Sequence, residues 1–381
     1  MAPRFPILPI YEPILGRKPS DVVQSFSCIL DVGQPIYLDS GSSAIGLALQ
    51  CAGIRLSDEI LVPAYHCPTM VTPVKCLGAK AVFYKINQDT SVSVDSIEEL
   101  VSHRSKAILV PHFFGIAQEM SEIRALCDRY GIMLIEDCAH AFFGIVNGRP
   151  VGYFGDFAVA STRKFFPGTD GGFLISKKAH VNTEVIRSRS LIDEISALID
   201  IIEEAFHYGK APVWNVVLRP LLATKSFLSS LTRAARRRHQ DKNNPDDSDD
   251  ISFSLDIKGM SRASKYLLRN SDIDYVCRTR VDNFRHLGSR LQGVPGLHCL
   301  LDSINGDMVP YMYPLIVDNR RIYHALRDHD WPVWRWDDSD PSCEVSRYYS
   351  KHLLQLPCHQ SLRVDDLDRL ADAIIELNTN L

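Results

Sequence analysis

The sequence has 381 residues, enough for a large α/β domain and a second, smaller one, each with its own core. Hydrophobic residues make up 45% of the chain and charged residues 23%, and the formal net charge of −4 is too small to gather nucleic acid or an anionic membrane. The ten cysteines contain no C-x-x-C pair, which argues against a zinc site and a disulfide framework. We therefore expect no metal, and a reducing compartment, by default the cytoplasm.

The amino terminus predicts neither a signal peptide nor a membrane-spanning helix, because prolines interrupt residues 1–16 before an apolar run develops. From residue 38 to residue 176, short apolar runs alternate with helical patterns. A loop of small residues opens a helix at 40–52, and Asp95 is the expected N-cap of a helix at 95–103. A further helix is expected at 121–130, and strands at 59–63, 79–84, 106–111 and 132–137.

This alternation predicts the fold class. Strands with continuous apolar runs are typical of a mostly parallel sheet that helices cover on both faces. In such sheets the chemistry gathers where the strands end, and Asp137 ends the strand at 132–137. We therefore expect an α/β domain whose site lies near Asp137.

The composition changes after residue 188. Residues 188–231 are helical in pattern, and residues 233–250 carry a basic block followed by an acidic one. Such blocks are usually solvated loops; a basic contact with a membrane or a polyanion is the alternative, which the acidic half opposes. We predict a large domain at 1–245, with a charged insertion at about 188–250, and a small α+β domain at 251–381. The expected elements of the small domain are helices at 260–270, 275–291 and 364–377 and a strand at 308–317.

Three groups of residues carry chemistry, and the first is Glu136-Asp137. An aspartate beside the ring nitrogen of pyridoxal phosphate (PLP) keeps that nitrogen protonated, which lets the ring withdraw electrons. A strand-end aspartate equally fits a magnesium ligand, a helix cap or a residue that orients another side chain.

The second group is S-T-R-K at 161–164, followed by D-G-G at 170–172. A lysine that holds PLP as a Schiff base must be buried, and burial lowers its pKa so that the free amine can attack. Hydroxyl groups just before Lys164 are placed to bind phosphate, and the glycines let the backbone approach closely. A surface Arg-Lys pair before a turn is the alternative.

The third group is S-G-S-S at 40–43, at the start of a helix. Free backbone N–H groups and the helix dipole make such a start an anion site, although a plain N-cap has the same composition. The three groups follow one another in the order phosphate loop, strand-end aspartate and lysine. This order favours a PLP site over the separate explanations.

On these residues the chain resembles the DegT/StrS-type PLP-dependent sugar aminotransferases. SGSSAIGLAL is similar to the S-G-T-x-A-L helix start of that family, LIEDCAHAFFG to its E-D-x-A-x-A-x-G segment, and STRKFFPGTDGGFLIS to its lysine block. The similarity is strong over residues 38–176 and weaker from there to the carboxyl terminus. It implies the PLP-dependent transferase fold type I, a large PLP-binding domain, a small C-terminal domain and a homodimer.

The resemblance also implies a role for each matching residue. Asp137 would bind the ring nitrogen, Lys164 would form the Schiff base, and His140 would lie beside the ring hydroxyl, where the family usually has Gln. The residues implied for the phosphate are Gly41, Ser42, Ser43 and Ser161.

Besides His140, and a segment before Lys164 that is one residue shorter than the common form, the chain departs from the family at two places. Cys67 occupies the position of the aromatic residue that stacks on the PLP ring, so Tyr65 or His66 is expected to stack instead. The family's N-x-R-M stretch, which reaches across the dimer, has only a poor counterpart at residues 256–260.

Three further features leave alternatives open. The segment WPVWRWDD fits either a substrate site in which Arg335 binds a carboxylate or a hydrophobic face of the small domain. His112 and Phe113 fit either a pocket wall or a packed strand end. In LPCHQSL, His359 is expected to be structural rather than catalytic.

The expected function is PLP-dependent transamination from an amino acid, such as glutamate, to a nucleotide-linked keto-sugar, in the synthesis of a polysaccharide or a glycosylated metabolite. The alternatives are a PLP enzyme with a non-sugar substrate and a non-catalytic scaffold or regulatory relative.

Overall fold

The computed structural model describes residues 5–12, 26–177, 181–210, 256–301, 304, 308–337 and 339–381. A seven-stranded sheet forms the larger part, in the order β1-β9-β8-β5-β4-β2-β3. Its strands are β1 Ile36–Leu38, β2 Glu59–Pro63, β3 Lys80–Tyr84, β4 Ser105–Pro111, β5 Met133–Asp137, β8 Phe157–Ala160 and β9 Gly172–Ser176. The five strands from β8 to β3 are parallel, and β9 runs antiparallel to both of its neighbours, so the mostly parallel sheet is confirmed.

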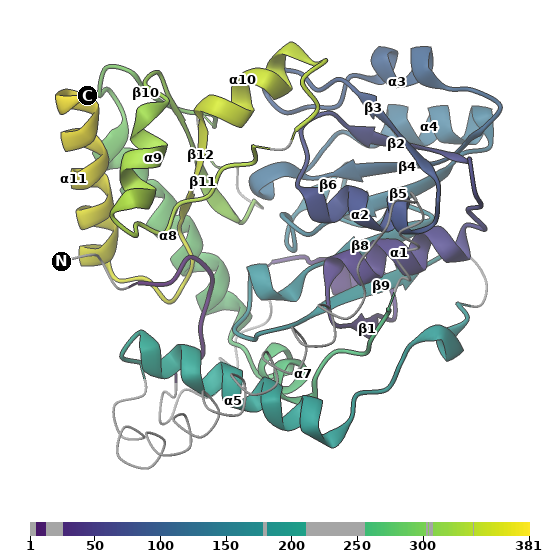
Figure 1. The fold of residues 1–381 in the computed structure, drawn as a ribbon, viewed down its shortest axis with the longest axis horizontal. Helices are drawn as coiled ribbons and strands as arrows, with labels where there is room; N and C mark the ends of the chain where they lie inside the picture. The colour runs from purple at the N-terminus through teal and green to yellow at the C-terminus, as the bar shows by residue number, and fades with distance from the viewer. Residues whose placement is uncertain are drawn as a thin grey trace, which may run out of the picture.

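Helices cover both faces of this sheet (Figure 1). The covering helices are α1 Gly41–Cys51, α2 Pro68–Cys76, α3 Val94–Leu100 and α4 Ser121–Tyr130. Successive residues of a strand point to opposite faces, and along β4 Leu109 joins the core under α1 and α2, while Val110 joins the core that includes α4. Strands buried on both faces need apolar residues at every position, which explains the continuous apolar runs.

A three-stranded antiparallel sheet forms the smaller part, on the other side of Figure 1. Its strands are β10 Leu297–Cys299, β11 Met312–Val317 and β12 Leu353–Pro357, and the helices around it are α8 Ile273–Leu291, α9 Arg321–Asp328, α10 Glu344–His352 and α11 Val364–Asn380. Apolar residues of α8, α9 and α11 meet this sheet in a third core. A short hairpin, β6 Ile145–Val146 and β7 Arg149–Pro150, lies apart from both sheets.

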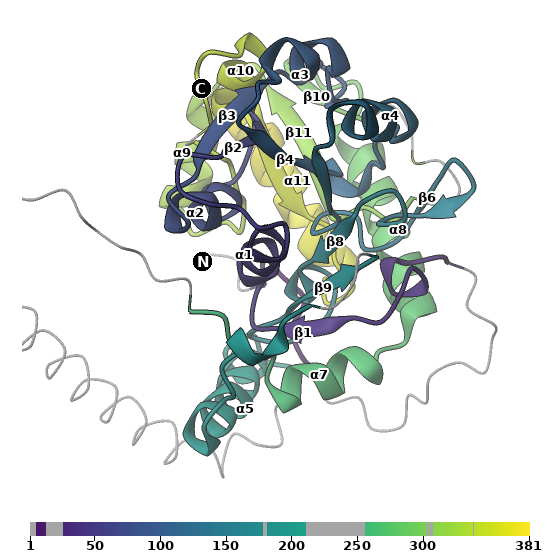
Figure 2. The same ribbon diagram turned by 90° about the vertical axis from the view of Figure 1, so that its right-hand side faces the viewer.

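Two segments cross the predicted domain boundary. Residues 5–12 pack on the smaller part, where Phe5 joins the third core and Ile10 N donates to Ser361 Oγ at 3.2 Å. Residues after 256 return to the larger part, where Gly259 bridges to Leu38. Helices α5 (Leu191–His207) and α7 (Arg262–Arg269) lie together beyond the β1 edge (Figures 1 and 2). The division at about residue 250 stays a prediction.

The expected elements that fall on described residues are present, with one wrong cap. Residues 211–231 of the helical pattern expected at 188–231 lie outside the described residues. The helix expected at 95–103 begins at Val94, because Ser93 and not Asp95 is its N-cap: Ser93 Oγ accepts from Ser96 N at 3.3 Å. Within the insertion, the structure describes α5, whereas the charged blocks at 233–250 lie outside the described residues. No described helix is long and apolar enough to cross a membrane.

Candidate active site

A cavity of about 220 Å³ lies at the carboxyl ends of β5 and β8, beside the start of α1. A smaller chamber adjoins it on the side of β4 and Trp336. Both are lined by Cys67, Met70, Asp137, Ala139 and Lys164. The site expected from the strand ends therefore lies where those strands end.

Strand β5 sends its two final carboxylates to different surroundings, because adjacent strand residues face opposite ways. Glu136 accepts hydrogen bonds from the backbone N–H groups of Gly152 (2.6 Å), Phe154 and Gly155 (both 2.9 Å), and its Oε1 lies 2.8 Å from His112 Nε2. Burial alone would raise the pKa of Glu136, but the hydrogen bond and charge of His112 and the backbone N–H groups lower it. Both carboxylate oxygens of Glu136 thus have hydrogen-bond partners, and they hold the 152–155 loop in place.

Asp137 faces the cavity instead. Its Oδ1 accepts from the Ala139 N–H at 2.9 Å, and the side chain lines both chambers. Burial raises the pKa of the Asp137 carboxyl, and the nearby charge of Lys164 opposes that rise. A buried carboxylate that needs a cation is suited to the protonated ring nitrogen of PLP.

Lys164 enters the same cavity from the neighbouring strand. It ends the short 3-10 helix η3 (Thr162–Lys164), which follows β8 directly. Burial lowers the pKa of the Lys164 ammonium, while Cys67 and Asp137 act to raise it. Its Nζ lies 5.4 Å from the centre of the Tyr311 ring. The amine is therefore placed and tuned as a nucleophile requires.

The start of α1 forms the opposite end of the larger chamber. Ser40 is its N-cap, and Ser40 Oγ accepts from the Ser43 N–H at 3.1 Å. Ser43 Oγ donates to Asp39 Oδ1 at 2.6 Å. Gly41 and Ser42 line the chamber, but Ser43 does not. The implied phosphate role of Ser43 therefore does not match its placement, because its N–H and its hydroxyl are both used inside the helix start.

Close backbone contact brings the lysine segment to the start of α1. A Cβ at Gly172 would lie 2.3 Å from the Ser40 carbonyl carbon, so only glycine fits there. Ser161 and Arg163 line the same chamber, and the buried Arg163 Nε has no hydrogen-bond partner among the described residues. A helix start, a hydroxyl group and an unpaired guanidinium N–H together suit a phosphate.

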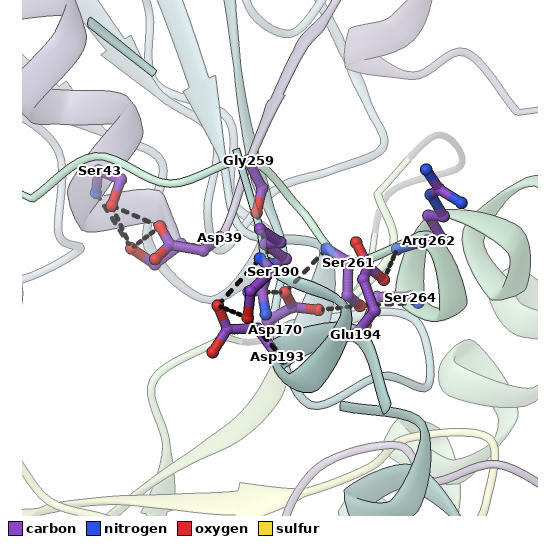
Figure 3. A network of polar contacts seen from close by, with 12 residues as sticks. Asp39, Ser43, Asp170, Ser190, Asp193, Glu194, Gly259, Ser261, Arg262 and Ser264 are labelled. Atoms are coloured by element: carbon purple, nitrogen blue, oxygen red, sulfur yellow. Dashed lines mark hydrogen bonds and ion pairs between the residues drawn. The ribbon is translucent and has the colours of Figure 1, made fainter. Parts of the chain in front are cut away.

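A network of polar contacts holds this corner together (Figure 3). Asp170 accepts from Ser261 N at 3.0 Å and Ser261 Oγ at 2.8 Å, and it also pairs with Arg189. Arg189 Nε donates to Gly259 O at 2.7 Å. The 256–260 stretch was expected as a poor counterpart of the family's cross-subunit segment. In this structure it is linked through Arg189 to the D-G-G turn at 170–172 of its own chain.

The structure does not bring Tyr65 or His66 to the cavity wall. Tyr65 is fully buried, 5.0 Å from the Trp336 ring, and His66 stacks on Phe83 at 5.0 Å. Cys67, the next residue, lines both chambers. The expected ring stacking by Tyr65 or His66 therefore does not match their placement, because both rings are buried in the protein core.

His140 and Trp336 are part of the wall of the smaller chamber, and Tyr311 packs against His140. The His140 ring lies 4.3 Å from that of Tyr311 and 5.1 Å from that of Trp336. Burial, followed by the charge of Lys164, lowers the pKa of His140 well below its usual value, so the ring is neutral. The sequence alone did not single out Tyr311, because only the packing of β11 brings it here.

The remaining candidates divide between wall and scaffold. His112, Phe113 and Trp336 line the smaller chamber. Arg335 does not; its Nε donates to Asp337 at 2.6 Å and its guanidinium lies 4.0 Å from the Tyr323 ring. His359 lines neither chamber, and its Nε2 lies 3.0 Å from the Pro6 carbonyl oxygen. This placement agrees with its expected structural role.

Comparison with known proteins finds a family that the first half of the chain resembles. The DegT/DnrJ/EryC1/StrS aminotransferase family matches residues 14–190. These residues are somewhat less than half of the chain, and their similarity to an aminotransferase family is the one that the sequence resemblance predicted.

Two curated relatives and one solved structure illustrate the similarity. The chain is 30% identical to GDP-perosamine synthase of Vibrio cholerae, over 49% of this chain and 55% of that protein. It is 29% identical to dTDP-3-amino-3,4,6-trideoxy-alpha-D-glucose transaminase of Micromonospora megalomicea subsp. nigra, over 97% of this chain and 91% of that one. The putative sugar aminotransferase Spr1654 from Streptococcus pneumoniae, in its PLP form, superimposes with a TM-score of 0.65 at 14% identity, over 97% of this chain and 99% of that one.

These matches differ in extent. The chain spans about half the length of the first two curated relatives that it matches, 55% and 48%. The structural similarity covers nearly the whole chain and confirms the predicted fold.

Proposed function

We propose that this chain is a PLP-dependent aminotransferase that moves an amino group from an amino acid, with glutamate as the expected donor, to the keto group of a nucleotide-linked sugar. The observation that carries the proposal is the convergence of Lys164 and Asp137 in one buried cavity whose other end is the start of α1. The names of both curated relatives include a nucleotide-linked sugar, which supports the acceptor class.

The cavity residues divide the chemistry among them. When bound, PLP supplies an aldehyde that exchanges amines and a ring that withdraws electrons from the carbon that loses its proton. Lys164 would hold the aldehyde until the amine of the donor displaces it. The freed Lys164 amine, whose pKa burial lowers, would then take a proton from the donor's α-carbon and, in the second half of the reaction, return one to the acceptor carbon. Asp137 would stabilise the proton on the ring nitrogen. His140, which is neutral, would share a hydrogen bond with the ring oxygen.

Other residues would bind and shield rather than react. The backbone N–H groups of Gly41 and Ser42, the Ser161 hydroxyl and the Arg163 guanidinium line the chamber that suits the phosphate. Phe113 and Trp336 form an apolar wall that would exclude water from the reacting carbon.

Compartment and assembly belong to the same proposal. All ten cysteines are unpaired, which supports a reducing compartment such as the cytoplasm. The homodimer that the family implies stays a prediction.

An absorbance experiment tests the proposed function. The purified chain is mixed with PLP, and the visible spectrum is recorded before and after glutamate is added. We expect a visible band for the wild type and for the surface control Lys106→Ala, removed by glutamate, and no such band for Lys164→Ala. A wild type that cannot be reconstituted would favour the scaffold alternative.

An acceptor screen then separates the two enzymatic alternatives. The glutamate-treated protein is freed of 2-oxoglutarate, which would restore the band by reversal of the glutamate step. It is then offered nucleotide-linked keto-sugars and, in parallel, free keto acids other than 2-oxoglutarate. We expect the visible band to return only with a nucleotide-linked sugar. Recovery with the keto acids alone would favour a non-sugar substrate.

A further inference from the structure

A buried arginine on α8 contacts the backbone at Lys164 and in the segment before β11. Arg280 is fully buried, and its hydrogen bonds in the described part of the chain all go to neutral oxygen atoms. Its Nη2 donates to Lys164 O at 2.6 Å. Its Nη1 donates to Pro310 O at 3.2 Å and to Tyr311 O at 3.1 Å. One side chain thus joins the lysine segment to the segment that precedes β11.

A glutamine extends this contact by one residue. Gln360 Oε1 accepts from Arg280 Nε at 3.1 Å, and Gln360 Nε2 donates to Phe165 O at 2.8 Å. The Arg280 guanidinium carbon lies 4.6 Å from the centre of the Phe165 ring. Two successive carbonyl groups, those of Lys164 and Phe165, are therefore held from the smaller part of the molecule.

Arg280 is a buried cation without a carboxylate partner among the described residues. Burial of a charge without a carboxylate partner is costly, and an apolar side chain would fill the same space without that cost. Burial lowers the pKa of Arg280 to about 10, so the side chain is still charged at neutral pH. A guanidinium offers donors in a rigid planar fork, which an apolar residue lacks and a lysine copies only in part. The geometry therefore favours a role in holding several carbonyl groups at once.

The side chains of the two residues that Arg280 holds lie close together beside the cavity, which Lys164 lines. Lys164 Nζ lies 5.4 Å from the Tyr311 ring centre, and that ring lies 4.3 Å from the His140 ring. Lys164 and Tyr311 belong to different elements of the fold. Lys164 follows β8, and Tyr311 precedes β11. The distance between amine and ring thus depends on how the two backbones are joined, and Arg280 makes that joint.

We propose that Arg280 is a positioning residue that fixes the backbones of Lys164 and Tyr311 relative to each other and so sets the place of the Lys164 amine in the cavity. The meaning of this positioning for transamination rests on the proposed function. The positioning itself is a property of the chain without cofactor.

The first test measures the Lys164 amine in the cofactor-free protein. Acylation of Lys164 by acetic anhydride is followed by mass spectrometry as a function of pH. In Arg280→Met the loosened segment admits water to the amine, so we expect the midpoint to rise by about one pH unit toward that of an ordinary lysine. Arg280→Lys should lie between the two. The matched control is Arg278→Met, since Arg278 lies on the same helix with a side chain 64% exposed, and it should behave as the wild type.

The second test uses the PLP-loaded protein. We expect kcat to fall about 10- to 100-fold in Arg280→Met with little change in the KM of the amino donor, because a misplaced reacting group impairs turnover more than binding. The pH at which the bound chromophore changes colour should shift in Arg280→Met and not in Arg278→Met. A purely structural residue would lower the melting temperature and leave both the chromophore and kcat per folded site unchanged.

The outcomes are separable. A folded Arg280→Met protein with the acylation midpoint and kcat of the wild type would overturn the proposal. If Arg280→Met does not fold, Arg280→Lys and Gln360→Met carry the same acylation test, and unchanged midpoints in both would overturn it. A wild type that fails to bind PLP would remove the proposed function, while the acylation midpoints would still decide the role of Arg280.

Discussion

At the scale of single residues, Asp137 and Lys164 are shifted toward their uncharged forms by the same cause. Burial raises the pKa of Asp137 and lowers that of Lys164, and each charge opposes the shift of the other. The charge on either group therefore depends on what stands beside it. A group that brings a protonated nitrogen next to Asp137 would favour the carboxylate and leave the Lys164 amine free to react.

The first prediction concerns the charge of Asp137. Asparagine keeps nearly the same volume and the oxygen that accepts the Ala139 N–H, but it cannot carry the negative charge. We expect Asp137→Asn to lower kcat/KM by about 100-fold or more, as for other lost electrostatic contacts in active sites. Steady-state kinetics of the reconstituted enzyme measures this loss.

The neighbouring carboxylate provides the control. Glu136→Gln breaks a buried pair with His112 and weakens the bonds to the 152–155 loop, so we expect it to lower the free energy of unfolding by about 3 kcal/mol. Wild-type kcat/KM in Asp137→Asn would show that the charge on Asp137 has no part in the reaction.

At the scale of elements, a turn near the carboxyl terminus holds the start of the chain. The fully buried His359 donates from Nε2 to Pro6 O at 3.0 Å, and its Nδ1 accepts from Ser361 N at 3.3 Å. Ser361 Oγ in turn pairs with both backbone groups of Ile10. The imidazole must be neutral to accept at Nδ1, so this contact depends on pH.

The second prediction follows from the sign of the His359 shift. Burial lowers the pKa of His359 to about 3, below the value of about 6.5 in an unfolded chain. Between these values the unfolded chain binds one more proton than the folded one, so acid destabilises the fold by up to about 1.4 kcal/mol per pH unit. The contribution of neutral His359 to the free energy of unfolding is therefore fully present above about pH 6.5 and is lost as the pH falls toward 3.

Urea unfolding at pH 7, 6 and 5 measures this loss. The free energy of unfolding should fall less steeply with falling pH in His359→Gln than in the wild type. The difference between the two slopes should be up to about 1.4 kcal/mol per pH unit, the effect of one proton. The control is His298→Gln, whose side chain is 62% exposed and which should keep the wild-type slope. Equal slopes in all three proteins would mean that His359 titrates normally.

Some elements were predictable because local sequence determines them. The strand predicted at 59–63 is β2 with the same bounds, since all five of its residues are buried and apolar runs identify such strands. The start of α3 could not be predicted from local sequence, because Ser93 and Asp95 are both good N-caps. The choice between them depends on a distant contact: Ser96 Oγ accepts from Lys85 N at 2.8 Å, which fixes the register of the first turn.

The candidate site was predictable for the same reason, and only in part. Lys164, Asp137 and the start of α1 follow in a recognisable order along the chain, and each carries its own chemical signal. Tyr311 and Arg280 reach the surroundings of the cavity by long-range packing, and nothing in their neighbouring sequence marks them. Trp336 lines the smaller chamber, and the sequence had left its segment open between a substrate site and a hydrophobic face. Ser43 and Tyr65 carried a signal by resemblance, but their hydrogen bonding and burial in this chain direct them elsewhere.

At the scale of the whole molecule, a backbone contact beside the two sheets joins the larger part to the smaller part. Phe114 O accepts from Tyr311 N at 3.0 Å, where the 3-10 helix η2 (Phe113–Gly115) meets the segment before β11. Gly115 has φ +101°, and a Cβ there would lie 2.5 Å from Val309 O. The contact therefore requires glycine both for its conformation and for its space.

The last prediction uses this contact to test whether the two parts work as a unit. Gly115→Ala and Gly148→Ala both place alanine at a positive φ, which costs about 1 kcal/mol in each. Only Gly115 is crowded, since a Cβ at Gly148 would meet nothing within 4 Å. We expect urea unfolding to show a further loss of about 1 to 3 kcal/mol in Gly115→Ala, because rigid backbone atoms must move apart. That movement displaces Tyr311 from Lys164, so PLP should also bind more weakly to Gly115→Ala and normally to Gly148→Ala. Equal stability and equal PLP affinity in the two variants would show that the cavity does not depend on the contact between the two parts.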